Sequence, residues 1–341
     1  MCKNWHLLLG YSVFQHRRRV SVTTLVLGSY VNAHCLQVLS LPGIGQSVLA
    51  NRYWSEHGGK GLNVGVGLKR LDADTVILLP VGDDKAGQDI TDELQRMNID
   101  TRWVIRCSSQ SGYGMGLVDS QGHNLIAVFP GANAQLNTPS VLDALQQCRP
   151  CNLYAQLEIP LETVIAAFSA ARQQSLCTIL NPSPWQPLPA ELMVMTQVMI
   201  INTTEAAALF NCNRQQLPQS PADWLQALPN LAGNINWQGD WLIVTLGDLG
   251  CVALGHDELL YQAAWTIAAI DTTGAGDAFN AGLLWALERE TPEQALRIAN
   301  ACGAYIAKHN GVLAHLPDRQ TLQAFMASQP QPEGRKIKRA F

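Results

Sequence analysis

Charged side chains are scarce in this sequence. Lys, Arg, Asp and Glu supply 15% of the 341 residues, against about 25% in a typical soluble domain. With 23 Lys and Arg against 27 Asp and Glu, the chain has no excess of positive charge for holding a phosphate backbone. Its basic clusters lie near the ends, at residues 17–19 and 335–339, where we expect solvated tails. The composition therefore disfavours nucleic acid as a partner.

Long hydrophobic runs are also missing. No apolar stretch approaches the about 20 residues that cross a bilayer, so we expect no membrane partner. Residues 1–22 are interpreted as an N-terminal extension rather than a signal peptide, because the Arg cluster follows the apolar stretch instead of preceding it. The chain is long enough for two domains or for one large α/β domain with an insertion.

A disulfide framework is not recognisable. The nine cysteines are an odd number, scattered through a chain long enough to fold without covalent links. Cys148 and Cys151 have the spacing of a redox or zinc pair. No second pair and no nearby histidine accompanies them, so we interpret the spacing as coincidental. We expect reduced thiols in a cytoplasmic protein.

Two common phosphate-binding sequences are absent. No GxxxxGK[ST] occurs, which excludes a P-loop enzyme, and Gly65-Val-Gly67 does not continue to the third glycine of a dinucleotide-binding motif. A phosphorylated ligand would have to be held by a different glycine-rich segment.

Short apolar runs alternate with helical patterns from residue 24 onward. Helices are expected at residues 61–71 and 85–97. Strands are expected at residues 24–28, 75–80, 152–157, 178–181, 198–201 and 241–246. This order predicts an α/β fold in which a central, mostly parallel sheet is flanked by helices.

One stretch interrupts the alternation. Two β-like runs, residues 112–119 and 124–130, are joined by a turn-rich link with no helix between them. Together with residues 47–55 they predict a small antiparallel sheet that projects from the main domain. Such a sheet suits a lid over a ligand. A plain hairpin at the edge of the main sheet is the alternative.

The C-terminal part is predicted to be helical, with helices over residues 277–288 and 293–308. The second helix begins with a capping box in which Thr291 is the N-cap, Pro292 the first helical residue and Gln294 the reciprocal partner. After Gln329 the composition turns to Pro, Gln, Gly and Lys. We therefore expect a basic, flexible tail over residues 329–341.

The sharpest motif is the segment from Ala269 to Gly282, which leaves a strand, passes through Gly274 and Gly276, and enters a helix at Asp277. Glycines let backbone N–H groups approach an anion, and the helix adds the positive end of its dipole. An acid beside such a cradle can remove a proton from an attacking hydroxyl. The plain alternative is a helix-stabilising acid in the first turn.

A second glycine motif, His57-Gly58-Gly59-Lys60-Gly61-Leu62-Asn63, also leads into a helix. Its N–H groups, the Lys60 ammonium and the Asn63 amide are donors suited to a polyhydroxylated ligand. A structural turn is the alternative.

These motifs, in this order, resemble the ribokinase family of sugar kinases, also called the phosphofructokinase-B group. The likeness extends over residues 23–328, and it implies a ribokinase-like kinase domain with a β lid around residues 47–55 and 112–130. It also includes the following shorter segments: Gly82-Asp83-Asp84, Pro130-Gly131-Ala132-Asn133, Gln156-Leu157-Glu158, Asn181-Pro182-Ser183-Pro184, Asn202-Thr203-Thr204-Glu205 and Thr245-Leu246-Gly247-Asp248-Leu249-Gly250.

The resemblance implies roles for individual residues. Asp277 would be the general base, and Gly274, Ala275 and Gly276 would form the anion hole. The sugar would be bound by Asn32, Gly59, Lys60, Gly61, Asn63 and Glu158. The nucleotide would be bound by Asn202, Thr245, Gly247, Asp248, Gly250 and Asn300. Glu205 would organise Mg²⁺, while Asp271 and Thr273 match part of a monovalent-cation site, which leaves K⁺ as an open question.

One segment departs from the family pattern. Many members carry an Asp soon after the first strand to bind sugar hydroxyls, but this chain offers Asn32 and has Ala33 or His34 where the acid is expected. His34 could replace the acid as a ligand or be an ordinary packed or exposed histidine. Because polar sites discriminate between hydroxyl patterns, the substrate cannot be carried over from ribokinase itself.

The sequence therefore predicts an ATP-dependent kinase that phosphorylates a sugar hydroxyl with Mg·ATP. The substrate is expected to be a small carbohydrate, a pentose such as ribose or a related sugar. A nucleoside or sugar-phosphate kinase of the same family, and a sugar-sensing protein without turnover, are the alternatives. The exposed edges of a lid sheet would also suit a homodimer, as the resemblance implies.

Overall fold

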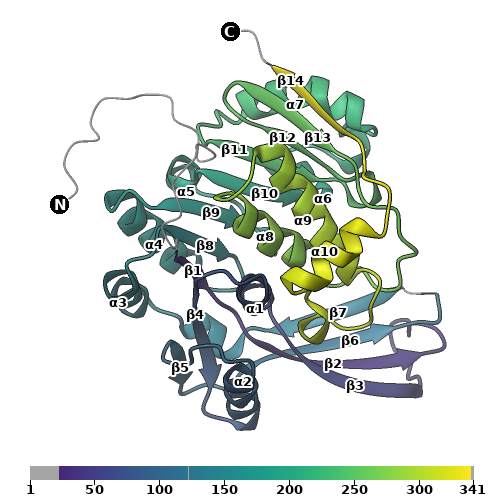
Figure 1. The fold of residues 1–341 in the computed structure, drawn as a ribbon. Helices are drawn as coiled ribbons and strands as arrows, with labels where there is room; N and C mark the ends of the chain where they lie inside the picture. Colours follow the sequence, from purple (N-terminus) through teal and green to yellow (C-terminus); the bar gives the residue numbers. More distant parts are fainter. Residues whose placement is uncertain (1–22, 122, 339–341) are drawn as a thin grey trace.

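A ten-stranded sheet forms the centre of the molecule (Figure 1). The computed structural model describes residues 23–121 and 123–338, so the expected extension, residues 1–22, lies outside the described residues. In spatial order the strands are β14 (Gly334–Lys338), β13 (Glu258–Gln262), β12 (Cys251–Leu254), β11 (Trp241–Thr245), β10 (Val198–Asn202), β9 (Cys177–Asn181), β8 (Asn152–Gln156), β1 (Thr24–Leu27), β4 (Thr75–Gly82) and β5 (Val104–Cys107).

Neighbouring strands from β5 to β11 pair in parallel, whereas β11 to β14 pair antiparallel. All four residues of β1 are buried, as expected for a strand covered on both faces. Leu25 and Leu27 pack into one core cluster and Val26 into the opposite one. The mostly parallel sheet predicted from the sequence is thus confirmed.

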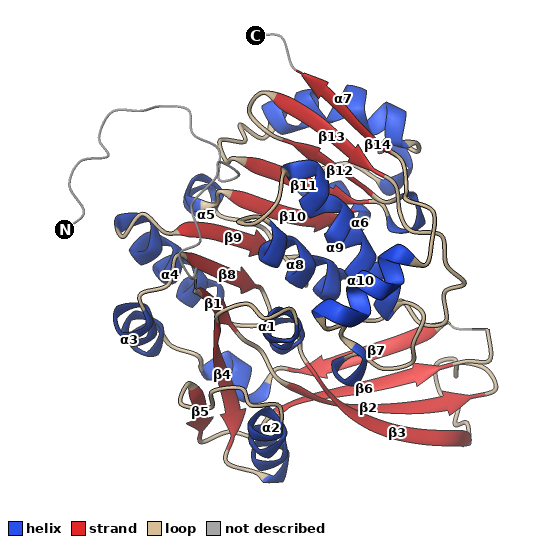
Figure 2. Cartoon of the chain, viewed as in Figure 1, coloured by secondary structure: helices blue, strands red, loops and turns tan. Residues whose placement is uncertain are grey.

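Helices cover both faces of this sheet (Figure 2). One core cluster contains residues of α3 (Thr138–Cys148), α4 (Leu161–Gln173), α6 (Thr203–Leu209) and α7 (Pro221–Asn234), together with Leu192 of α5 (Ala190–Met195). The opposite face is covered by α1 (Lys60–Arg70), α8 (Ala275–Ala286) and α9 (Pro292–Ile306). A third cluster packs α2 (Lys85–Arg96) and α10 (Arg319–Ala327) beside β4. The capping box predicted at Thr291 is present at the start of α9.

A separate four-stranded sheet, the lid sheet, projects from the large one (Figure 1). Its order is β3 (Ala50–Gly58), β2 (Val31–Val38), β6 (Gly112–Val118) and β7 (Asn124–Phe129). The β6–β7 hairpin is therefore part of a distinct sheet and not an edge of the main one. Two details differ from the prediction: residues 31–38 form a strand that the sequence analysis did not assign, and β2 pairs with β6 in parallel.

The lid sheet is joined to the main domain through a buried amide. The Asn133 side chain accepts a hydrogen bond from the backbone N–H of Tyr30 at 2.8 Å and donates one to its carbonyl at 2.7 Å. Asn133 is only 1% exposed. The base of β2 is thus fixed to the segment that follows β7, and the lid begins at a defined point.

The predicted flexible tail is wrong for residues 334–338. These residues form β14, which pairs with all five residues of β13. Without β14, β13 would present an unpaired edge of N–H and C=O groups. A basic residue of this segment also forms ion pairs: the Lys336 ammonium lies 2.8 Å from the Glu293 carboxylate and also pairs with Glu258.

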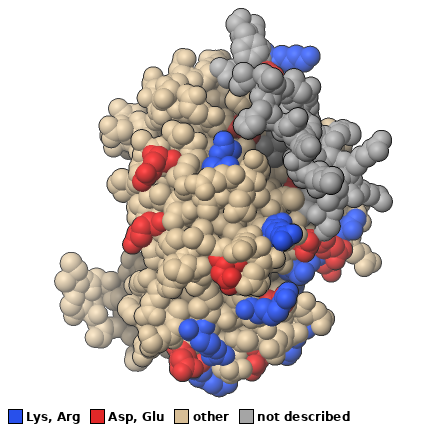
Figure 3. All heavy atoms as spheres, turned by 90° about the vertical axis from the view of Figure 1, so that its left-hand side faces the viewer, with Lys and Arg blue, Asp and Glu red and all other residues tan. Residues whose placement is uncertain are grey.

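Charged side chains of both signs are interspersed over the face shown in Figure 3, with broad uncharged areas between them. Within the described residues, none of the helices combines the length and the apolar composition needed to cross a bilayer.

Candidate active site

The candidate site lies where the strand order of the large sheet reverses. From β1 the chain proceeds to β4 and β5 on one side, whereas β8 to β11 follow on the other. Loops that leave the carboxyl ends of strands at such a point diverge and open a crevice. The segments that leave β1 and β8 carry Ser29 and Glu158, and the Ser29 hydroxyl donates to the Glu158 carboxylate at 2.6 Å.

The start of α1 is held against these two residues. The backbone N–H of Lys60 donates to the same Glu158 oxygen at 2.9 Å. Gly59 has φ 115°, and a Cβ there would lie 2.3 Å from the Ser29 carbonyl oxygen, so only glycine fits. The second glycine motif therefore serves close packing as well as ligand binding, and it directs Lys60 and Asn63 into the crevice.

The start of α8 reaches the crevice from the opposite half of the chain. Gly274, the N-cap, has φ 74°, and Asp277 in the first turn is 7% exposed. The Asn63 amide donates to Oδ2 of Asp277 at 2.8 Å. A Cβ at Gly276 would meet no atom within 4 Å, so there is open space beside the first N–H groups of the helix.

The charges in the crevice are strongly coupled. Burial raises the pKa of the Asp277 carboxyl above its ordinary value, although the nearby Lys60 charge and the Asn63 hydrogen bond oppose the rise. Burial alone would lower the pKa of Lys60, but the carboxylates of Asp277, Glu158 and Glu205 outweigh it, and the pKa is raised. Lys60 is therefore positively charged next to an acid that gains a proton more readily than an exposed one.

Asn63 has an unused acceptor. Its Oδ1 is one of two buried side-chain polar atoms without a hydrogen-bond partner in the described part of the chain. A buried acceptor without a donor costs about 1–3 kcal/mol. The amide nitrogen of the same side chain is committed to Asp277. Oδ1 is therefore suited to accept a hydrogen bond from a bound hydroxyl.

The predicted nucleotide-binding residues follow β10 and β11. Asn202 and Glu205 form a capping box at the start of α6, so the structural role considered for this pair is present. Burial raises the pKa of Glu205, and its hydrogen bond from the Asn202 N–H opposes the rise. Thr245 ends β11, and Gly247, Asp248 and Gly250 form the turn that follows it. The Asn300 side chain, by contrast, donates to Gln262 and Cys251, which positions it beside β12 and β13.

Asp271 and Thr273 precede α8. The Asp271 carboxylate accepts the N–H of Thr273 at 2.9 Å, which orders the loop before Gly274. Among the residues that the structure describes, no group of three or more His, Cys, Asp and Glu side chains could hold a metal ion.

Asn32 and His34 lie in strand β2 of the lid sheet. Strand alternation and register place both on the lid face that also carries Tyr53 and Tyr113. On that face the His34 ring bonds the Tyr53 hydroxyl at 2.6 Å and stacks on Tyr113. His34 is thus an ordinary packed histidine.

The opposite lid face, which carries Ala33, is turned toward α8 and contributes an acid that the sequence analysis did not select. Glu56 of β3 accepts a hydrogen bond from the Val312 N–H at 3.2 Å. Val312 in turn lies against Gly274, because a Cβ there would be 2.5 Å from the valine side chain. Burial raises the pKa of Glu56, the Val312 bond opposes this, and Asp271 adds to it. The sequence motifs gave no signal for this residue, because its contact with Val312 joins segments that are far apart in the chain.

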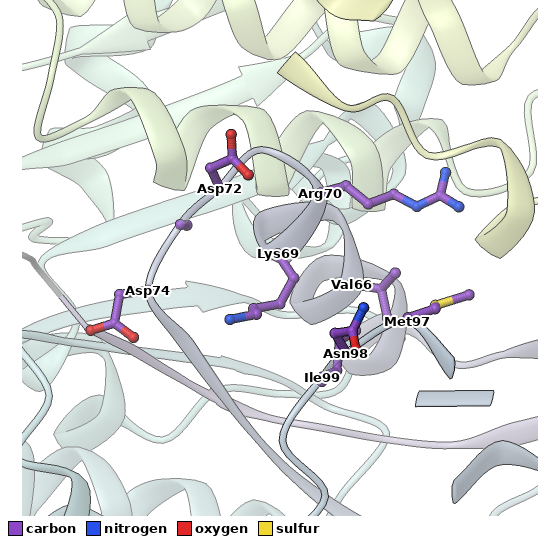
Figure 4. Close-up of a pocket in the computed structure, with 9 residues that line it drawn as sticks. Val66, Lys69, Arg70, Asp72, Asp74, Met97, Asn98 and Ile99 are labelled. Carbon is purple, nitrogen blue, oxygen red and sulfur yellow. The ribbon is translucent and has the colours of Figure 1, made fainter. Parts of the chain in front are cut away.

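A surface pocket of about 510 Å³ lies at the other end of α1 (Figure 4). It is lined by Val66, Lys69, Arg70, Asp72, Ala73, Asp74, Met97, Asn98 and Ile99. At about 1.5 Å per helical residue, the lining residues of α1 lie roughly 9 to 15 Å along the helix from Lys60. The pocket is therefore distinct from the crevice.

A helix-covered α/β sheet with a β lid, and a crevice in which a glycine-initiated helix meets a buried acid, together define a sugar kinase. The model of the pfkB family carbohydrate kinases matches residues 24–319. The chain belongs to this family, as the motifs predicted, and is an ATP-dependent carbohydrate kinase.

Individual relatives agree with this assignment. The ribokinase of Haemophilus influenzae is 29% identical over 308 residues, which cover 89% of this chain and 98% of that protein. The crystal structure of the Thermotoga maritima ribokinase superposes with a TM-score of 0.78 at 25% identity, over 90% of this chain and 100% of that one. An Arabidopsis thaliana ribokinase complexed with ribose and ATP has the same fold, with a TM-score of 0.79, 22% identity and coverage of 90% and 99%.

Proposed function

We propose that the protein transfers the γ-phosphate of ATP to a primary hydroxyl of a small carbohydrate, a pentose such as ribose or a related sugar. Asp277 is the general base, and Gly274, Ala275 and Gly276 form the anion hole. The contact that carries the proposal is the hydrogen bond between Asn63 and Asp277, because it brings a predicted sugar-binding side chain next to the predicted base.

In this proposal the sugar lies between α1 and the lid sheet. Lys60 and Asn63 bind its hydroxyls, Glu158 accepts a further one, and Gly59 and Gly61 keep the backbone close. Asp277 accepts the proton of the attacking hydroxyl as the new O–P bond forms and the bond from the γ-phosphorus to ADP breaks. The N–H groups at the start of α8 stabilise the charge on the transferred group.

ATP is proposed to bind along Asn202, Thr245, Gly247, Asp248 and Gly250, with Asn300 beside the base. Mg²⁺ is expected with it and would neutralise phosphate charge. The buried Glu205 carboxylate, whose pKa burial raises, fits a nearby cation. The absence of a larger acidic cluster in the described chain agrees with a metal held mainly by phosphates and water. Asp271 and Thr273 are proposed as part of a K⁺ site.

The test is an ADP-release assay over pentoses, hexoses and nucleosides with the wild type and Asp277→Asn. The variant should lose about 10²- to 10⁴-fold in kcat, because it cannot accept the proton. Asp72→Asn, at an exposed acid beside the remote pocket, is the matched control and should retain wild-type turnover. Wild-type kcat in Asp277→Asn would show that the base is assigned wrongly, and preference for nucleosides would favour the alternative substrate class.

We also propose that two lid sheets pair in a homodimer. The lid face that carries His34 exposes large apolar side chains, including Tyr53 (59%), Tyr113 (39%) and Leu125 (51%). Sedimentation velocity should detect a dimer, and Tyr53→Lys with Leu125→Lys should shift it to monomer. A wild type that stays monomeric at high concentration would overturn this proposal.

A further inference from the structure

Glu56, on strand β3 of the lid sheet, contacts the loop that follows α9. Its carboxylate oxygen Oε2 accepts a hydrogen bond from the Val312 N–H at 3.2 Å. Gly311 makes this approach possible, because it has φ 83° and a Cβ there would lie 2.8 Å from the same oxygen. The contact therefore joins the lid to a defined point of the main domain.

The same loop, residues 307–312, packs against the segment that leads into α8. The Ala307 carbonyl accepts a hydrogen bond from the Ile270 N–H at 2.7 Å. The Val312 side chain occupies the space beside Gly274, where an added Cβ would lie 2.5 Å from Cγ1 of the valine. Gly274 is the N-cap of α8 and part of the proposed anion hole. The loop thus contacts the lid on one side and the anion hole on the other.

Val312 is held firmly between these two contacts. It is 4% exposed, and its carbonyl accepts hydrogen bonds from the N–H groups of His315 at 3.0 Å and Leu316 at 3.1 Å. Its N–H group and its side chain are attached to the same Cα, so a shift of one moves the other. Close-packed interiors transmit such displacements instead of absorbing them. A change in the position of Glu56 therefore reaches Gly274 through a single residue.

We propose that Glu56 is a positioning residue that aligns the anion hole for phosphate transfer. It acts through Val312 on Gly274 and not through contact with the sugar. This inference rests on the proposed function and adds to it, because the lid then sets the geometry of the N–H groups at the start of α8 as well as covering the sugar. A misplacement of about 1 Å can cost about 10²-fold in rate, so a modest shift at Gly274 is measurable.

The experiment measures kcat and KM in the ADP-release assay, with the sugar that the wild type phosphorylates best. Glu56→Gln keeps an oxygen that can accept the Val312 N–H, whereas Glu56→Ala removes it. Val312→Ala keeps the N–H but removes the side chain beside Gly274, and a double variant combines the two alanine substitutions. Ser55→Ala, at an exposed position on the other face of β3, is the matched control. Melting temperatures show whether each variant is folded.

Glu56→Ala should lower kcat about 10- to 100-fold, while KM for the sugar stays within about twofold. Glu56→Gln should recover most of the lost kcat, because a neutral amide oxygen accepts the same hydrogen bond, though more weakly. Val312→Ala should also lower kcat at nearly constant KM. The double variant should be no slower than the slower single variant, since both changes break one chain of contacts. Ser55→Ala should behave as the wild type.

Other outcomes would overturn the inference in distinguishable ways. If Glu56→Ala raises KM for the sugar and leaves kcat unchanged, Glu56 only holds the lid over the sugar. If the losses of the two single variants multiply in the double variant, Glu56 and Val312 act independently. Wild-type kcat and KM in Glu56→Ala would show that the contact has no role in turnover. These results leave the proposed function intact, whereas wild-type protein that phosphorylates no sugar would overturn that function and the inference with it.

Discussion

At the scale of single residues, the site depends on how Lys60 and Asp277 affect each other. The positive charge of Lys60 opposes the rise that burial causes in the pKa of Asp277. A base acts only when it is deprotonated, so Lys60 extends the range of proposed activity toward acid pH. Lys60 thus has an effect on the base in addition to any contact with sugar or phosphate.

Lys60→Met should shift the acidic limb of the kcat/KM profile to higher pH. Without the ammonium, burial acts on Asp277 with less opposition, and the carboxyl keeps its proton to a higher pH. The measurement is kcat/KM between about pH 5 and 8. Lys69→Met, in the last turn of the same helix, is the matched control and should keep the wild-type limb. An unchanged limb in Lys60→Met would contradict the coupling.

The Asp277 carboxyl should also lower the stability of the folded protein at neutral pH. Because the pKa of Asp277 is raised in the folded protein, protonation of its carboxyl stabilises the folded state. This stabilisation is fully present below the pKa of the unfolded chain, and it is lost as the pH rises through the pKa of the folded protein. The Asp277→Asn variant has no carboxyl at this position, so its stability does not fall in this way as the pH rises. Its melting temperature relative to the wild type should therefore increase from about pH 4 to pH 8. A difference that stays constant or falls with rising pH would contradict the assigned direction.

The roles of residues could be predicted from the sequence where the residues that act together are close in the chain. Gly274, Gly276 and Asp277 lie within one turn of each other, and so do Lys60 and Asn63, so each group could be recognised from its motif. Glu56 could not, because its contact with Val312 brings together residues that are far apart in the chain. Ser29 was missed for the same reason, since its partner Glu158 follows a strand far along the chain.

At the scale of elements, the two glycines at the start of α8 have different roles. Gly274 is needed for folding, because its φ of 74° and the close Val312 side chain leave no place for a Cβ. Gly276 faces open space, where a Cβ meets no protein atom. Because Gly276 has no side chain, this space stays open for a ligand.

Gly276→Ala should keep or slightly raise the melting temperature, since replacing a helical glycine is worth about 0.4–1 kcal/mol when space permits. Its kcat/KM for ATP should fall at least about 10-fold if the methyl group intrudes on the phosphate. Gly274→Ala is the contrasting variant: it should lower the free energy of unfolding by about 1–2 kcal/mol or more, and therefore lower the melting temperature. Full activity in Gly276→Ala would argue against an anion at that position.

The strand β14 was mistaken for a tail because its sequence has no apolar alternation. It is a strand only because β13 offers an edge, and because Glu258 and Glu293 neutralise Lys336. The unassigned strand β2 is similar: it is paired on both sides within the lid sheet. Strands that depend on partners elsewhere in the chain leave a weak local signal.

Ending the chain at Glu333 should destabilise the fold by about 2–3 kcal/mol, through loss of the β13 pairing and the Lys336 ion pairs. Because β14 contributes none of the proposed site residues, kcat/KM should stay within about twofold. Lys336→Ala, which keeps the strand, separates the charge contribution. The measurements are urea denaturation and the kinase assay, and a large loss of kcat/KM in folded protein would contradict a purely structural role.

At the scale of the whole molecule, the Asn133 link and the Glu56–Val312 contact are two of the points that join the lid sheet to the main domain. Ligands that bind between them should therefore stabilise the folded protein by mass action. A preferred sugar with a non-hydrolysable ATP analogue, each at 100 times its Kd, should add about 2.7 kcal/mol per ligand. Thermal melting tests this, and Asp277→Asn should respond similarly, since binding does not require proton removal. No shift with any sugar would contradict a site between the two sheets.

The overall fold was the most predictable level, because alternation of strands and helices is repeated along the chain and each unit supports the same architecture. The position of the lid sheet was harder to predict from the sequence, because it depends on β2 lying between β3 and β6.

Asn63 and Asp277, which share a hydrogen bond in the crevice, are separated by 214 positions in the chain. During synthesis the lid and the first glycine motif leave the ribosome long before α8 exists. In the proposed mechanism, a nascent chain that ends before Gly274 therefore has the proposed sugar-binding groups but lacks the proposed base and anion hole, and it cannot consume ATP. Under this proposal, phosphate transfer begins only when nearly the entire polypeptide has been made and folded.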